Sequence, residues 1–389
     1  MDSRRVRCYF PPVPMATRPF ILLSDERCLD HATWGPHPET RDRITAVRGR
    51  LRTGVLADAL IEGHPRAAGW DTILAAHDEE YLLRFEEAAL SGREWFDHRD
   101  NQLGEASYQA ALLAASSGPT AIDLIEAGRA PAAFCAVRPP GHHAERSQAL
   151  GFCFLNNAVI AARHWQRAHG RRRVLVLDFD AHHGNGIQHA FEADPDVLYV
   201  SLHEHPTFSF PGTGYAEETG TGPGEGATLN IPLLPGARDA EALEALEARI
   251  DPAVRAFRPE AIVVAAGFDG HLLDDMSGLG YSTDLFRRFG RAVALWSNDR
   301  AGGRSLTLLE GGYHLGALCD GVEQYLLGLA GADAANPHNP PFSKGKDARA
   351  ASSEGEARGL SLTTNGIRTS CRVPASGNET GDEMRSPCT

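Results

Sequence analysis

The chain of 389 residues carries 38 Lys and Arg side chains against 51 Asp and Glu side chains, a formal net charge of −13. This acidic balance disfavours direct nucleic-acid binding, because such binding depends on cationic side chains that neutralise phosphates. The seven cysteines are scattered without a CxxC pair, which disfavours a zinc ribbon or a disulfide scaffold and favours a reducing, cytoplasmic location. No apolar run reaches the ~18 residues needed to cross a bilayer, so we expect no membrane partner.

Short apolar segments recur along the chain, and each is followed by a polar or glycine-rich turn. In chain order they are FILLSD (20–25), AFCAVRPPG (133–141), VLVLDFDAHHG (174–184), VLYVSLH (197–203), AIVVAAGFDG (261–270) and SLTLLEGGY (305–313). Helical patterns lie between them over 107–128, 156–170, 239–257 and 283–296. Apolar strands that alternate with helices predict an α/β fold, in which helices cover both faces of a central, mainly parallel sheet.

The composition changes at both ends of the chain. Residues 1–18 contain several prolines, and we expect a loose N-terminal extension there. The motifs described below need one another, so residues 19–333 are predicted to form a single domain. Residues 334–389 are rich in Ser, Gly, Asn, Pro and charge with little apolar periodicity, which predicts a mostly disordered tail.

The segment LDFDAHHGNG (177–186) concentrates metal-ligand residue types at the end of a predicted strand. Alternate strand residues share a face, so Asp178 and Asp180 point the same way, and His182 follows as the chain turns. Asp and His bind divalent metals of the zinc type, and open catalytic sites keep three protein ligands plus water. Asp269, between glycines at another strand end, would complete the set. For the DxDxHHGNG string, the alternative of a capping aspartate beside a surface histidine pair is disfavoured. Asp269 taken alone would more often be a helix-capping or turn aspartate.

Two further strand ends carry residues suited to proton transfer. His142 and His143 follow a Pro-Pro-Gly turn, and adjacent histidines can receive different partners that set their tautomers and pKa values. Tyr313 follows a double glycine, and a phenol beside a metal can donate to a developing oxyanion. Standing alone, the tyrosine would be better explained as an interfacial residue.

Five motifs together identify a family resemblance: RPPGHHAERSQALGFCFLNN, LDFDAHHGNG, VSLHEHPTFSFPGTGYAEETG, AAGFDG and LEGGYHLG. Their order and spacing resemble the metal-dependent histone deacetylase superfamily, which includes histone deacetylases, acetylpolyamine amidohydrolases and acetoin-utilisation proteins. The similarity runs from about residue 25 to about residue 331. It implies an arginase/deacetylase-like fold for the domain at 19–333.

The resemblance also implies a role for each matching residue. The zinc ligands would be Asp180, His182 and Asp269, with Fe²⁺ or Co²⁺ as alternative metals. The catalytic residues would be His142, His143 and Tyr313, with Asp178 supporting His142 and Asn185 orienting His143. A structural potassium ion (K⁺) would be held by Asp178, Asp180, His182, Ser201 and Leu202. A second monovalent site would involve Phe191, Asp194 and Val197. The remaining histidine of the motif, His183, is expected to be structural or to support these residues.

A narrow substrate channel is implied as well. It would be formed by Gly151, Phe152 and Phe210, with Met276 and Asp100 near the rim. Asn185 stands where one branch of the family has aspartate, and asparagine is typical of the class II-like branch. A neutral amide raises the pKa of a neighbouring imidazole less than a carboxylate does. Met276 stands where a polyamine-preferring relative has an acidic residue, which disfavours a polyamine substrate.

These expectations converge on a zinc-dependent amidohydrolase that removes an acetyl or other acyl group from a lysine side chain or a related cationic amine. Acetylated lysine in a peptide or protein and acetylated polyamine or another small N-acyl amine remain open as substrates, as does the oligomeric state. Arginase-like hydrolysis ranks lower, because it needs a two-metal carboxylate cluster and this chain has His-His-Gly after its DxD. A catalytically silent acyl-lysine-binding module is disfavoured because every catalytic position is filled.

Overall fold

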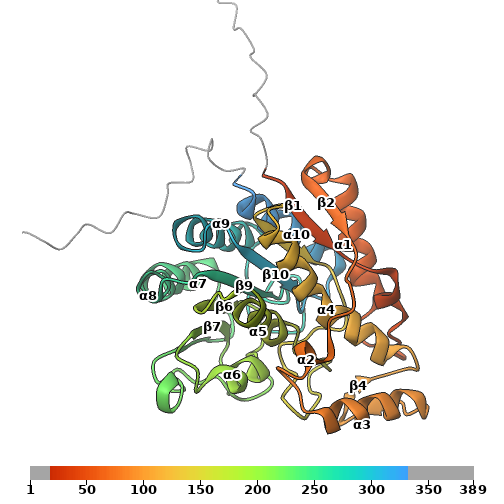
Figure 1. The fold of residues 1–389 in the computed structure, drawn as a ribbon. Coiled ribbons are helices and arrows are strands. Elements are labelled where there is room, and N and C mark those ends of the chain that lie inside the picture. Colours follow the sequence, from red (N-terminus) through yellow and green to blue (C-terminus); the bar gives the residue numbers. More distant parts are fainter. Residues whose placement is uncertain (1–17, 332–389) are drawn as a thin grey trace, which may run out of the picture. The chain divides into compact units, whose positions relative to one another are not determined.

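A parallel β-sheet forms the centre of the computed structural model, which describes residues 18–331 (Figure 1). Eight strands lie in the order β2-β1-β5-β10-β9-β6-β7-β8, and every neighbouring pair is parallel. The sheet strands are β1 (Phe20–Leu23), β2 (Leu60–Gly63), β5 (Ala132–Cys135), β6 (Val174–Asp178), β7 (Val197–Glu204), β8 (Thr228–Leu233), β9 (Ala261–Ala266) and β10 (Ser305–Leu309). A separate antiparallel hairpin pairs β3 (Trp95–Phe96) with β4 (His98–Gln102).

Successive side chains of the central strands enter opposite faces of this sheet. In β6, Leu175 and Leu177 belong to one buried apolar cluster, whereas Val174 and Val176 belong to the other. The alternation follows from the two-residue period of a strand, and it explains why these strands read as continuous apolar runs. Both faces therefore need a helical cover.

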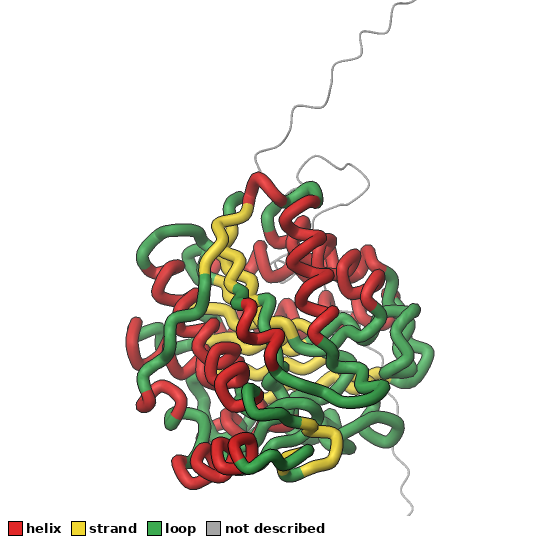
Figure 2. Tube along the Cα trace, turned by 90° about the vertical axis from the view of Figure 1, so that its right-hand side faces the viewer, coloured by secondary structure: helices red, strands yellow, loops and turns green. Residues whose placement is uncertain are grey.

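Helices pack on each face, and they appear on both sides of the strands in Figure 2. The first apolar cluster includes residues of α1 (Arg41–Thr53), α7 (Asp239–Ala245), α8 (Asp251–Phe257), α9 (Thr283–Arg300) and α10 (Leu315–Leu329). The second includes residues of α2 (Trp70–Ile73), α3 (Glu79–Leu90), α4 (Ser107–Glu126), α5 (Asn157–His169) and α6 (Asn185–Phe191). The predicted α/β architecture, with helices on both faces of a parallel sheet, is confirmed.

The predicted elements are recovered with shifted boundaries. The six apolar segments correspond to β1, β5, β6, β7, β9 and β10, and the helical pattern at 283–296 extends to Arg300. The pattern at 239–257 contains a π-helical turn, Leu246–Ile250, between α7 and α8. The segments of β2 and β8 were not predicted as strands. Both lie at sheet edges, where a strand tolerates weaker patterns, and β8 contains Pro232, which a central strand would exclude.

The remaining expectations concern the two ends of the chain, membrane-spanning segments and the cysteines. The N-terminal extension and the C-terminal tail lie outside the described residues, apart from Arg18 of the extension. Within residues 18–331, no helix has the length and apolar character that a membrane span requires. Four cysteines in this range are free thiols and all are buried: Cys28, Cys135, Cys153 and Cys319.

Candidate metal centre and active site

The predicted site residues follow the carboxyl ends of four adjacent strands, β5, β10, β9 and β6. Asp178 is the last residue of β6, and Asp269 follows β9 by three residues. The histidine pair follows β5, and Tyr313 follows β10. Because parallel strands end at the same edge of a sheet, segments far apart in the sequence meet there.

Asp180, His182 and Asp269 converge at this edge. The Nδ1 atom of His182 lies 3.1 Å from Oδ1 of Asp180 and 3.0 Å from Oδ2 of Asp269. One ligand atom from each of the three buried residues lies within 4.8 Å of the others. The other ring nitrogen of His182, Nε2, is 3.2 Å from the Met276 carbonyl oxygen, to which it can only donate. Nδ1 is therefore the ring nitrogen that faces both carboxylates, and in the neutral ring its lone pair is directed at them, as in a metal-ligating histidine.

The charges of this group also fit a divalent cation. Burial and the neighbouring Asp180 raise the pKa of Asp269 to about 6. Burial lowers the pKa of His182, but its hydrogen bonds to both carboxylates outweigh burial and raise that pKa well above the usual value. Two carboxylates and one imidazole are a donor set that zinc, iron(II) and cobalt(II) accept. The residues present therefore fit the predicted metal.

Glycines let the backbone pack directly against these carboxylates. A Cβ atom built on Gly267 would collide with Asp180, and one built on Gly311 would collide with both Asp180 and Asp269. The Gly311 amide instead donates to Oδ2 of Asp180 at 2.8 Å. Gly267 of the AAGFDG motif and Gly311 of the LEGGY motif are therefore required for close approach at this centre.

His142 and His143 lie beside the group, with ring centroids 3.9 Å apart. Nδ1 of His142 donates to Oδ2 of Asp178 at 3.1 Å, and its Nε2 lies 3.9 Å from Oδ1 of Asp180. Burial lowers the pKa of His142, but the two carboxylates outweigh burial and raise it to about 10. Burial and the charge of His142 hold the pKa of His143 well below the usual value. At neutral pH, His142 is therefore positively charged and the adjacent His143 is neutral.

Asn185 fixes the orientation of His143. Its Nδ2 donates to Oε1 of Glu145 at 2.5 Å, so its Oδ1 faces the imidazole and accepts from Nδ1 of His143 at 2.8 Å. An amide oxygen only accepts, and Nδ1 of His143 therefore carries the proton. The other nitrogen, Nε2, is left unprotonated. The second histidine of the DAHH segment, His183, instead contacts Thr213 and Gln188 through its two ring nitrogens.

Tyr313 is held by its backbone and by its ring. Its amide donates to Oδ2 of Asp274 at 2.6 Å, and the Arg43 guanidinium lies 4.9 Å from its ring centroid. Burial raises the pKa of Tyr313 well above the usual value, so the phenol keeps its proton at neutral pH. The phenol remains available as a hydrogen-bond donor.

The three predicted channel residues gather around His143 and Tyr313. Gly151 has a positive φ of 55°, and a Cβ there would collide with the His143 ring and approach Phe210. The Phe210 ring lies edge-on to His143 at 4.9 Å, and the Phe152 ring lies 6.0 Å from that of Tyr313. Aromatic walls above the histidine pair are consistent with a narrow apolar channel.

Other predicted residues have contacts that do not test their roles. The Asp100 carbonyl accepts from His37, and the contacts of Met276 are made by its backbone. Ser201 pairs with Asp178 across β6 and β7, and its hydroxyl contacts His203. The potassium ligands, including Leu202, and the second monovalent site at Phe191, Asp194 and Val197 stay predictions.

Sequence reasoning missed two buried acidic groups next to the site. Glu310 accepts from the amides of Gly141 and His142 through Oε2, whereas its buried Oε1 has no hydrogen-bond partner. Burial raises the pKa of Glu310 to about 7. Glu39 lies fully buried against Arg138 and Arg43. Glu310 lies in the segment LEGGY and directly follows the apolar strand SLTLL, so an acid at that strand end was the one signal in the sequence. Glu39 lies in the segment ETRDR, where nothing marks it as buried.

Comparisons with known proteins agree with this geometry. A family model described as "Histone deacetylase domain" matches residues 37–329. Histone deacetylase 14, chloroplastic, of Arabidopsis thaliana is 35% identical over 324 residues, which is 79% of this chain and 76% of that protein. Polyamine deacetylase HDAC10 of Homo sapiens is 35% identical over 313 residues, covering 78% of this chain and 46% of the relative.

A solved structure gives the same result for the fold. The chain is similar to the crystal structure of the HDA15 HD domain with a TM-score of 0.76 and 34% sequence identity, over 81% of this chain and 89% of that one. The matching family agrees with the sequence motifs, with the parallel sheet and with the convergence of the candidate site residues at its carboxyl edge. The chain belongs to the histone deacetylase family and is a hydrolytic deacetylase.

Proposed function

We propose that the protein is a zinc-dependent amidohydrolase that removes an acetyl group from a lysine side chain or a related cationic amine. The observation that carries the proposal is the convergence of Asp180, His182 and Asp269 beside a histidine pair. Zinc bound by these three residues would polarise the acyl carbonyl and acidify a water molecule. A structural potassium ion near Asp178 is part of the same proposal.

His143 is the general base of this scheme. Its Nδ1–H is directed at Asn185, which leaves the unprotonated Nε2 to take a proton from the attacking water. His143 then returns this proton to the nitrogen of the leaving amine. The low pKa that burial imposes keeps the ring neutral before the reaction, as a base requires.

His142 and Tyr313 support the developing charge. The hydrogen bond from His142 to the Asp178 carboxylate favours the imidazolium form and fixes the ring beside its neighbour. Tyr313 keeps its proton and can donate it in a hydrogen bond to the oxyanion, which is usually a large contribution to catalysis. The Asp274 carboxylate positions the backbone of the tyrosine.

The channel supports a substrate with a slender aliphatic stem. Phe152 and Phe210 offer apolar walls, which accommodate the methylene groups of acyl-lysine or of an acetylated polyamine. We favour acyl-lysine, because Met276 presents no carboxylate to a second amine. Acetylated polyamine is the second candidate, since a relative at 35% identity is named a polyamine deacetylase.

One comparison of rates tests the proposal. Purified protein, with its metal content measured, is assayed for acetate release from an acetyl-lysine peptide and from acetylated polyamines at equal concentrations. We expect zinc to be the main metal and the peptide to be the better substrate. Acetate release that persists unchanged after complete metal removal would overturn the metal-dependent scheme, and faster release from polyamines would reassign the substrate.

A further inference from the structure

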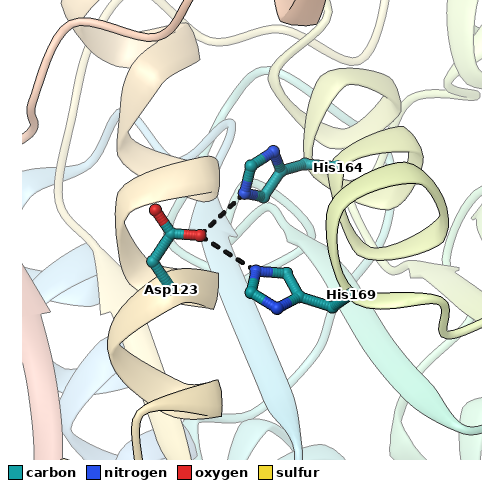
Figure 3. Close-up of side chains that lie close together, drawn as sticks. All are labelled: Asp123, His164 and His169. Atoms are coloured by element: carbon teal, nitrogen blue, oxygen red, sulfur yellow. Dashed lines mark hydrogen bonds and ion pairs between the residues drawn. The ribbon is translucent and has the colours of Figure 1, made fainter.

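A second group of metal-ligand side chains lies between α4 and α5, outside the candidate active site. It consists of Asp123 on α4 with His164 and His169 on α5, and we call it the α4–α5 cluster. Nε2 of each histidine is 2.9 Å from the same atom, Oδ1 of Asp123. The ligand atoms lie within 4.8 Å of one another. Both rings point at this carboxylate oxygen in Figure 3.

The cluster is remote from the candidate catalytic centre. α5 begins next to Asn156, whose side chain donates to the carbonyl of Ala144 beside the histidine pair. The helix then runs away from the carboxyl edge of the sheet, and His169 is its last residue, a few positions before β6 begins. At a rise of ~1.5 Å per residue, the helix carries His169 about 18 Å along its axis from Asn157. The two groups therefore share no residue and no ion.

The spacing of the three ligand atoms suits a zinc-class ion. Metal–nitrogen and metal–oxygen distances of ~2.0–2.2 Å in a tetrahedral site put neighbouring ligand atoms about 3.3–3.6 Å apart. The present separations of 2.9 Å from nitrogen to oxygen are therefore about half an ångström too short, and small rotations of the side chains can open them. Two imidazoles and a carboxylate are ligands that zinc, copper(II), nickel(II) and cobalt(II) share.

Partial exposure gives an ion access to the cluster. The side chains of His164 and His169 are 15% and 23% exposed, and that of Asp123 is 41% exposed. Water can then complete the coordination shell, as in sites with three protein ligands. Oδ2 of Asp123 faces Arg66, whose side chain is 67% exposed and can turn toward solvent.

A neighbouring interaction holds the two helices in place. One turn further along α4, Glu126 accepts from the Trp165 indole of α5 at 3.2 Å. The same carboxylate pairs with Arg171 and Arg304, at 2.7 Å and 3.0 Å. The ligands of the cluster are thus carried by elements that are already fixed relative to one another, which lowers the cost of ordering a metal site.

We propose that Asp123, His164 and His169 form a second divalent-metal site, which takes a zinc-class ion and cross-links α4 to α5 independently of catalysis. In the absence of an ion, each histidine donates from Nε2 to the carboxylate. When an ion binds, each neutral ring carries its proton on Nδ1 instead, so that both Nε2 lone pairs face the metal.

Zinc titration of the intact protein tests the site. Protein that holds its tightly bound metal is freed of loose ions and equilibrated with Zn²⁺, and bound zinc per chain is measured by elemental analysis. We expect wild type to hold one more zinc than His164→Ala or His169→Ala. The control His64→Ala removes an exposed histidine near a single carboxylate, and should bind zinc as wild type does. Equal zinc content in wild type and both cluster variants would overturn the proposal.

Asp123→Asn separates metal binding from helix packing. The amide oxygen still accepts from both histidines, so the variant should fold with the melting temperature of the metal-free wild type. Loss of an anionic ligand should weaken zinc binding by at least about tenfold. Zinc should therefore raise the melting temperature of wild type more than that of Asp123→Asn. An identical rise in both proteins would contradict a site built on this carboxylate.

Discussion

Glu39 offers a sharp test of how the active-site framework is held. Its carboxylate is fully buried and accepts from Nε and Nη2 of Arg138 and from Nη1 of Arg43. Arg43 also donates from Nε to the carbonyl oxygen of Gly312 at 2.6 Å, and Gly312 directly precedes Tyr313. Replacing Glu39 by Gln keeps the shape of the side chain but leaves two buried guanidinium groups with no carboxylate.

Two estimates of the cost agree. Burial raises the pKa of Glu39, but the two arginines outweigh burial and lower it from 4.5 to about 2. At ~1.36 kcal/mol per pKa unit, this corresponds to about 3 kcal/mol in favour of the charged form. Removing one member of a buried ion pair costs about 3–5 kcal/mol. We therefore expect Glu39→Gln to lower the free energy of unfolding by about 3–5 kcal/mol.

Urea unfolding of the whole chain at pH 7 measures this loss. The matched control is Glu62→Gln, because Glu62 also pairs with an arginine but both side chains are about half exposed, at 46% and 40%. That surface pair should contribute less than about 1 kcal/mol. A loss below about 1 kcal/mol for Glu39→Gln as well would refute the reasoning that this buried carboxylate compensates both arginines.

The pH dependence of the same pair gives a second readout. A carboxyl group with a lowered pKa in the folded state contributes its full stabilisation above its unfolded pKa, and loses it as the pH falls toward the folded pKa. For Glu39 this window runs from 4.5 down to about 2. Wild type and Glu39→Gln should therefore converge in stability across this window, and a constant difference would contradict the assignment.

Four further predictions follow from the site and the core. His143→Ala and Tyr313→Phe should each lower the turnover of an acetyl-lysine peptide at least about 100-fold, and near-normal rates in a folded variant would refute the assigned role. Chelation should abolish acetate release and added zinc should restore it; release that survives chelation would rule out metal dependence. Gly151→Ala should reduce turnover while the protein stays folded, because the new methyl group displaces His143, and unchanged kinetics would show that the ring can move away. Burial lowers the pKa of His77 to about 4, so between pH 6.5 and 4 the unfolded state binds a proton that the folded state does not, and stability falls as the pH falls. His77→Gln should remove about 1.4 kcal/mol per pH unit of that decline, measured by urea unfolding. An unchanged slope would contradict this assignment.

Local patterns in the sequence were sufficient to predict the main strands and the convergence at their ends. LDFDAHHGNG places Asp180 and His182 directly after a continuous apolar strand, and AIVVAAGFDG does the same for Asp269. Parallel strands then bring these ends together without further information. The convergence of these three side chains was predictable because each lies within a few residues of a strand end.

Contacts between distant segments could not be predicted in the same way. Glu39 and Arg138 are 99 residues apart, and nothing in their own segments marks them as a buried pair. Asp123 lies 41 residues before His164, on a helix whose acidic residues look like ordinary surface charges. These pairings depend on how the elements pack, which a single sequence does not specify. The edge strands were missed for a related reason, since β2 is short and β8 contains a proline.

The glycines at the candidate metal centre limit how this part of the chain can vary. A side chain at Gly267 or Gly311 does not fit without moving a carboxylate, so alanine at either position alters the centre while every candidate ligand is retained. Alanine at these two positions would thus perturb the centre without replacing a single polar group. Substitutions that preserve the centre are therefore restricted to neighbouring positions whose side chains point away from the carboxylates. Part of the information that specifies this centre is therefore carried by residues with no functional group.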